Sequence, residues 1–127
     1  MSEKRPPLGI LLLDGGHERT HYALVMASGA AALGRDVVLF ATNAGCRLLL
    51  ADCPLLQDPR EAHLAARGVA GIGTLLAAIS ALGVQRMACE AGLKAEDLGS
   101  VPLAAGVERA GVASFLAAVG SGQIISL

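Results

Sequence analysis

Two hydrophobic patterns alternate along this chain: short continuous apolar runs, and longer stretches in which apolar residues recur every three or four positions. A short run bounded by turn residues is typical of a buried strand, whereas the three-to-four spacing indicates a helix that buries one face. The runs predict strands at residues 8–13, 36–41, 84–89 and 123–126. The helical spacing predicts helices at residues 18–33, 73–82 and 111–119.

Weaker signals lie between these elements. Asn43 is a favourable cap for a short helix over residues 43–50, and residues 90–98 predict another. We expect a short additional strand within residues 99–105. Residues 52–71 contain two prolines and several charges, and they predict a mobile excursion with at most one or two helical turns.

The alternation of strands and helices predicts right-handed β-α-β units, and therefore a parallel sheet covered by helices on both faces. At 127 residues the chain suits one hydrophobic core. We assign residues 8–127 to a single α/β domain. Residues 1–7, where Pro6 and Pro7 cannot donate backbone hydrogen bonds, are expected to form a disordered tail.

Composition narrows the possible functions. Hydrophobic residues make up 54% of the chain, but there is no Trp, one Tyr and two Phe, so few rings are available to stack nucleobases. The net charge of −1 lacks the basic excess that binds nucleic acid. No apolar run reaches the roughly 18 residues of a membrane span, and the first residues lack the apolar segment of a signal peptide. These features predict a cytoplasmic protein that binds neither nucleic acid nor membrane.

Three segments follow the carboxyl ends of predicted strands, which is where ligands gather in open α/β sheets. They are Asp14-Gly15-Gly16-His17, Ala41-Thr42-Asn43-Ala44 and Ala88-Cys89-Glu90. The three cysteines of the chain are an odd number for a disulfide framework, so each is a core residue, a metal ligand or a reactive thiol. Cys89 is the cysteine best placed for chemistry.

Cys89 immediately precedes a predicted helix, whose free N–H groups would stabilise a thiolate. A thiolate attacks sulfane sulfur and then carries the transferred atom as a persulfide. Glu90 opposes this effect unless its carboxylate points away from the sulfur. The alternative is a buried thiol that acts as a small hydrophobic side chain.

The other two cysteines, Cys46 and Cys53, are seven residues apart and lack the C-x2-C spacing or the neighbouring His of a zinc site. We interpret Cys46 as a core residue and Cys53 as a loop residue. Whether either of them acts as a resolving thiol for Cys89 stays open.

His17 and His21 lie four residues apart at the start of a predicted helix, with Asp14 one turn earlier. Because the glutamate of an H-E-x-x-H site is missing, we predict no metal site and favour a solvated helix start. His17 and Asn43 are candidates for the wall of a pocket around Cys89.

The Asp14-Gly15-Gly16 turn is a candidate cradle for a small anion. It lacks the glycine spacing of dinucleotide-binding and phosphate-binding loops. The sequence therefore gives no support to a nucleotide site.

Three longer segments resemble one known family. They are LLLDGGHERTHYALVMASGAAALGRDVVLFAT, GVAGIGTLLAAISALGVQRMACEAGLKAEDL and AGVERAGVASFL. On these segments, which span about residues 8–119, the chain resembles the DsrE/DsrF-like proteins. The similarity is to the branch called peroxiredoxin-like or intracellular sulfur oxidation. Its most specific part is the Ala88-Cys89 strand end, followed about twenty residues later by Gly106-Val107-Glu108.

This resemblance implies a mostly parallel sheet of five or six strands and a homo-oligomer, whether dimer, trimer or hexamer. It implies that Cys89 accepts sulfur and passes it on as a persulfide, in relay with TusA-like or rhodanese-like carriers and without a metal or organic cofactor. The terminal segment 123–127 would then be suited to a subunit interface. Peroxidase chemistry is not implied, because no T-x-x-C motif is present.

Two departures from the family's pattern stand out, and the first of them, together with the acidic Glu90, favours a second hypothesis. The segment after Cys89 is several residues shorter than the family's and contains no Met, and Thr42-Asn43-Ala44-Gly45-Cys46 replaces an aromatic region. A non-catalytic oligomeric module of the same fold, which binds a small anion or metabolite at Gly15-Gly16, would also fit. This alternative predicts an unreactive Cys89.

Overall fold

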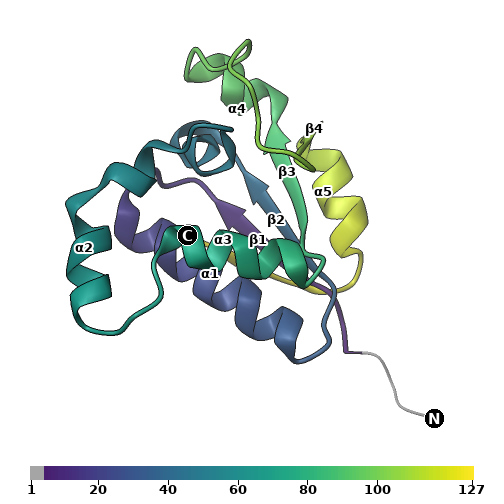
Figure 1. Cartoon of the computed structure of the whole chain (residues 1–127). Helices are drawn as coiled ribbons and strands as arrows, with labels where there is room; N and C mark the ends of the chain where they lie inside the picture. The colour runs from purple at the N-terminus through teal and green to yellow at the C-terminus, as the bar shows by residue number, and fades with distance from the viewer. Residues whose placement is uncertain (1–4) are drawn as a thin grey trace.

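A five-stranded sheet forms the centre of the computed structural model, which describes residues 5–127 (Figure 1). The strand order is β4-β3-β2-β1-β5, and every neighbouring pair is parallel. The strands are β1 (Leu8–Leu12), β2 (Val37–Ala41), β3 (Gln85–Cys89), β4 (Glu108–Ala110) and β5 (Gln123–Ser126). The predicted parallel α/β fold is confirmed.

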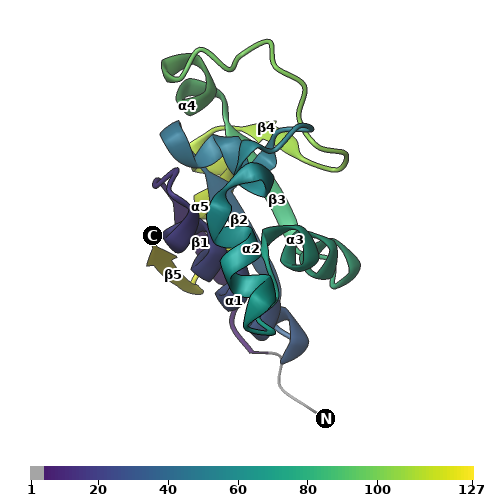
Figure 2. The ribbon, with the colours of Figure 1, turned by 60° about the vertical axis from the view of Figure 1, so that its left-hand side comes forward.

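Helices cover both faces of this sheet (Figures 1 and 2). The longer helices are α1 (His17–Ala32), α2 (Pro59–Ala66), α3 (Ile72–Ala81) and α5 (Val112–Val119). The short ones are α4 (Glu90–Ala95) and two 3-10 helices, η1 (Asn43–Leu49) and η2 (Pro54–Gln57). On one face of the sheet, α1 and α3 contribute side chains to the larger core cluster. On the other face, α5 contributes Phe115 and Val119 to the smaller cluster.

The alternation of side chains along β2 and β3 divides the core in two. Leu39 and Ala88 face the α1 and α3 side, whereas Phe40, Met87 and Cys89 belong to the cluster beneath α5. All five residues of β2 are buried, which is why its apolar run is continuous. Strand positions thus determine the face to which each side chain points.

The predicted strand at residues 99–105 is wrong. That segment makes one isolated bridge, between Leu103 and Leu50, and the fourth strand in chain order is Glu108–Ala110 instead. This three-residue strand lies at the sheet edge with its side chains largely exposed, so it lacks the apolar run that marks a buried strand.

The excursion at residues 52–71 contains more helix than predicted. It holds η2 and the eight-residue α2. Asp58 caps α2 by accepting a hydrogen bond from the Arg60 N–H at 2.8 Å, and Pro59 takes the first helical position, where its missing N–H costs nothing.

At the other end of the chain, residues 1–4 of the predicted tail lie outside the described residues. Pro7 is tied to β5, because its carbonyl accepts a hydrogen bond from the Gln123 N–H at 3.0 Å. The longest helix, α1, has 16 residues, and no helix within residues 5–127 combines the length and apolar character needed to cross a membrane.

Gly9 lets α5 approach the sheet. A Cβ at this position would lie 2.5 Å from Val119 Cγ2 and 2.9 Å from Phe115 Cζ, both in the buried core. We expect Gly9→Ala to lower the free energy of unfolding by about 1–3 kcal/mol, because α5 must shift to admit the methyl group.

The matched control is Gly29→Ala, within α1, where an added Cβ meets nothing within 4 Å. It should raise the free energy of unfolding by about 0.5–1 kcal/mol through helix propensity. Urea unfolding of both variants measures these changes, and an equal effect of the two substitutions would contradict this packing.

Candidate functional site

The parallel register brings three strand ends to one edge of the sheet. Leu12 of β1 pairs with Ala41 of β2, which pairs with Ala88 of β3. The turn after β1, the start of η1 and the start of α4 therefore meet at this edge, as the sequence predicted from the strand pattern.

Three glycines let these segments pack backbone against backbone. Gly15 lies against Ala44, where a Cβ would fall 2.9 Å from the Ala44 carbonyl oxygen. A Cβ on Gly45 would overlap the Leu12 carbonyl oxygen, and one on Gly92 would overlap the Asn43 backbone nitrogen. Contacts therefore run continuously from the β1 turn through η1 to α4.

Cys89 ends β3 and caps α4. Its Sγ accepts a hydrogen bond from the Gly92 N–H at 3.4 Å. The side chain is buried, with 9% of the residue exposed, among apolar neighbours that include Met87 and Phe40. Glu90, the next residue, is exposed as the first residue of α4.

Cys46 is fully buried, and its thiol donates a hydrogen bond to the Ala41 carbonyl oxygen at 3.5 Å. Burial and the neighbouring Cys89 sulfur raise the pKa of Cys46 to about 11. A hydrogen bond from the Cys89 backbone N–H lowers this pKa, but its effect is smaller. The two cysteines are thus neighbours, but Cys46 remains a protonated thiol at neutral pH. A protonated thiol is a poor nucleophile, which disfavours a resolving role.

Cys53 lies in the loop just before η2, as predicted, and its side chain is buried in the core cluster. Burial raises the pKa of its thiol as well. Residues 5–127 contain no group of three or more His, Cys, Asp or Glu side chains able to hold a metal ion.

The Asp14-Gly15-Gly16 turn is closed by its own carboxylate. Asp14 Oδ1 accepts a hydrogen bond from the Gly16 N–H at 2.6 Å, and the exposed Arg19 lies 3.7 Å from Oδ2. The Gly16 N–H is therefore already satisfied, and the Asp14 negative charge opposes a second anion. Asn43 contacts Gly92 through its backbone nitrogen, and the residue is exposed.

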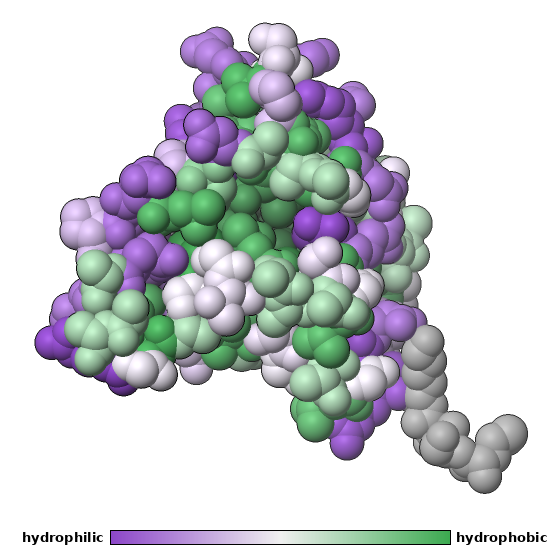
Figure 3. All heavy atoms as spheres, viewed as in Figure 1, coloured by the Kyte–Doolittle hydropathy of each residue, from purple (hydrophilic) through white to green (hydrophobic). Residues whose placement is uncertain are grey.

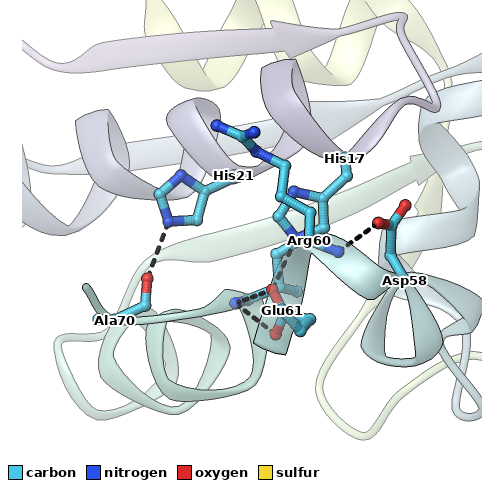
Figure 4. A network of polar contacts seen from close by, with 7 residues as sticks. His17, His21, Asp58, Arg60, Glu61 and Ala70 are labelled. Atoms are coloured by element: carbon cyan, nitrogen blue, oxygen red, sulfur yellow. Dashed lines mark hydrogen bonds and ion pairs between the residues drawn. The ribbon is translucent and has the colours of Figure 1, made fainter. Parts of the chain in front are cut away.

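His17 is buried on the α2 side of the fold (Figure 4). Its Nε2 donates to Glu61 Oε2 at 2.6 Å, while its Nδ1 is buried without a partner among the described residues. The ring stacks on His21, which bonds the Ala70 carbonyl oxygen at 2.8 Å. This pairing directs the imidazole to α2 rather than to Cys89.

Glu61 is the residue that sequence analysis missed. Its carboxylate also accepts the Ile72 N–H at 3.0 Å, so it caps α3 and joins α2 to the start of α1. Burial raises the pKa of Glu61, but the hydrogen bonds from His17 and Ile72 outweigh that effect and lower it below 4.5. The sequence does contain one sign of this role. Gly71, which precedes α3, has no side chain to cap that helix, so another residue has to accept its first N–H groups.

Comparisons with known proteins agree with this architecture. The model of the DsrE/DsrF-like family matches residues 8–127. No curated protein sequence matches the chain significantly.

Two solved structures are similar in fold. The crystal structure of the ychN protein from E. coli has a TM-score of 0.72 and 17% sequence identity, over 96% of this chain and 99% of that one. Protein MTH1491 from Methanobacterium thermoautotrophicum, a protein of unknown function, has a TM-score of 0.64 and 15% identity over the same shares. At these identities the likeness concerns the fold alone.

We expect Glu61→Gln to lower the free energy of unfolding by about 1–3 kcal/mol at pH 7, because it weakens charged hydrogen bonds to His17 and Ile72. The pKa of Glu61 is lower in the folded chain than in the unfolded one, so the carboxylate stabilises the fold above about pH 4.5. That contribution is lost as the pH falls through the folded-state pKa.

Urea unfolding of native and variant protein at pH 7 and at pH 3 tests this linkage, with Asp52→Asn as a control that removes an exposed carboxylate. The difference in stability between native and Glu61→Gln protein should be smaller at pH 3 than at pH 7, because the lower pH protonates more of the native carboxylate. A difference that is equal at both pH values would show that the carboxylate charge is not involved.

The Cys46 thiol should resist alkylation in the native state. With a pKa of about 11, about one Cys46 in a thousand is a thiolate at pH 8, and the thiol is fully buried. Iodoacetamide at pH 8 followed by peptide mass spectrometry should label Cys46 at least about 100-fold more slowly than a free thiol, and at a normal rate in urea. Equal labelling with and without urea would refute its burial.

Proposed function

The chain belongs to the DsrE/DsrF-like family, and from this premise we propose that it carries sulfane sulfur as a persulfide on Cys89. Family membership supports a role related to sulfur relay. The observation that carries the assignment to Cys89 is its place at the end of β3, where Sγ accepts the Gly92 N–H. This backbone N–H is a hydrogen-bond donor for the sulfur that would accept the transferred atom.

Neither of the other two thiols is as well suited to attack a sulfur donor. Cys46 and Cys53 are buried and have raised pKa values, so neither supplies a thiolate readily at neutral pH. Glu90 begins α4 as an exposed residue, which leaves the carboxylate accessible to water and reduces its repulsion of the Cys89 sulfur.

The proposed reaction balances without an external oxidant. The Cys89 thiolate attacks the outer sulfur of a donor persulfide, R–S–SH; the donor S–S bond breaks, a Cys89 S–S bond forms, and R–S⁻ leaves. An acceptor thiolate then attacks the outer sulfur on Cys89, becomes the new persulfide and regenerates the Cys89 thiolate. Neither step needs a metal or an organic cofactor.

Donor and acceptor are proposed to be small cytoplasmic thiol carriers of the TusA-like or rhodanese-like kind. We include a homo-oligomer in this proposal, with β5 at the sheet edge as a candidate for the interface.

One observation favours the second candidate, a non-catalytic module of the same fold. The Cys89 side chain belongs to the apolar cluster of Phe40 and Met87, and 9% of the residue is exposed. A thiol in that setting can serve as core filling alone. Reactivity of the native thiol separates the two candidates.

Brief exposure of the native protein to a low-molecular-weight persulfide, followed by intact-protein mass spectrometry, tests the proposal. We expect a gain of one sulfur atom, about 32 Da, in the native chain. Cys89→Ser should abolish this gain, whereas Cys46→Ser should retain it. Incubation with a thiol acceptor should then remove the added sulfur.

Circular dichroism and urea unfolding establish that each variant is folded. Loss of the gain in Cys46→Ser but not in Cys89→Ser would move the carrier role to Cys46. A folded native chain that gains no sulfur would refute the carrier function and leave the non-catalytic module.

A further inference from the structure

Gly92 is a glycine that its own helix does not need. It is the third residue of α4, it is buried, and its φ lies outside the left-handed region that favours glycine. Glycine inside a helix is less stable than alanine, because the unfolded chain has more conformations to lose. The reason for a glycine here therefore lies in what the backbone of residue 92 contacts.

The end of β2 lies directly against this backbone. A Cβ on Gly92 would lie 2.5 Å from Thr42 Oγ1 and 3.0 Å from Thr42 Cα, and it would overlap the Asn43 backbone nitrogen. Two of these three atoms belong to the main chain, so they cannot turn aside as the end of a flexible side chain would. With any other residue at position 92, the start of α4 would have to move away from β2.

The rest of α4 is held in place independently. Leu93 is fully buried, and Glu96, which ends the helix, accepts a hydrogen bond from Arg47 Nη1 of η1 at 2.8 Å. Figure 3 shows mainly hydrophilic residues at the end of the molecule that carries α4 in Figure 1, so the outer side of this helix meets water. A displacement caused at residue 92 would therefore fall on the first turn of α4, where the Gly92 N–H meets Cys89 Sγ.

We propose that Gly92 is a positioning residue for sulfur transfer, a role that rests on the persulfide chemistry proposed for Cys89. The absence of a side chain lets its N–H reach Cys89 Sγ at 3.4 Å and hold the sulfur in one orientation. Attack on the outer sulfur of a donor requires Sγ to line up with the S–S bond that breaks. A sulfur held in one orientation reaches this alignment in more of its encounters.

The rate at which the full-length chain gains one sulfur from a low-molecular-weight persulfide tests this role by intact-protein mass spectrometry. Gly92→Ala should gain sulfur at least about tenfold more slowly than the native chain, because the first turn of α4 is displaced. The matched control is Gly99→Ala, in the turn after α4, where a Cβ would make an ordinary contact 3.8 Å from Lys94 Cγ. This control should keep the native rate.

Circular dichroism and urea unfolding separate positioning from a purely structural role. A structural role alone would lower the stability of Gly92→Ala but leave the rate of the folded protein unchanged, and that result would overturn the proposal. If the native chain gains no sulfur at all, the persulfide function fails first. If only the difference between Gly92→Ala and the native chain is missing, the function stands and the role of Gly92 falls.

Nuclear magnetic resonance of the native chain gives a second readout that needs no variant to fold. The amide proton of Gly92 should change its chemical shift when Cys89 takes up sulfur, because this N–H donates directly to Sγ. The amide of Gly99 should change much less. An unchanged Gly92 amide, or an equal change at both glycines, would also overturn the proposal.

Discussion

The carboxyl edge of the sheet depends on close backbone packing that only glycine permits. At Gly15, Gly45 and Gly92, a Cβ would come within 3 Å of atoms in a neighbouring segment. These contacts let η1 lie across the ends of β1 and β2 while α4 rests on the start of η1. Any larger residue would push these segments apart and open the edge.

This packing gives two neighbouring cysteines different hydrogen-bond partners. Cys46 is locked inside the core with its thiol on the Ala41 carbonyl, and its pKa is about 11. Cys89 caps α4 and receives a backbone hydrogen bond instead. Glu61 ties α2 to the starts of α1 and α3 through its hydrogen bonds to His17 and Ile72.

The sequence predicts four of the five strands closely, including the largely exposed edge strand β5, whose predicted bounds match the observed ones. The continuous apolar runs place β1, β2 and β3 within one residue of their observed bounds, and with them the position of Cys89. Strand β4 escapes prediction because an exposed three-residue edge strand has no apolar pattern. The pairing of His17 with Glu61 joins residues 44 positions apart, and that of Ile72 with Glu61 joins two separate helices. Such relations exist only in the folded chain, because no local spacing encodes them.

We propose that this edge of the sheet presents the Cys89 sulfur for group transfer. A crystal structure of the protein after treatment with a persulfide donor tests it most directly. We expect electron density for one additional sulfur bonded to Cys89 Sγ, with η1 and α4 in place and with Cys46 and Cys53 unmodified. Density for added sulfur on either of those thiols, or an unmodified Cys89 in the treated crystal, would contradict it.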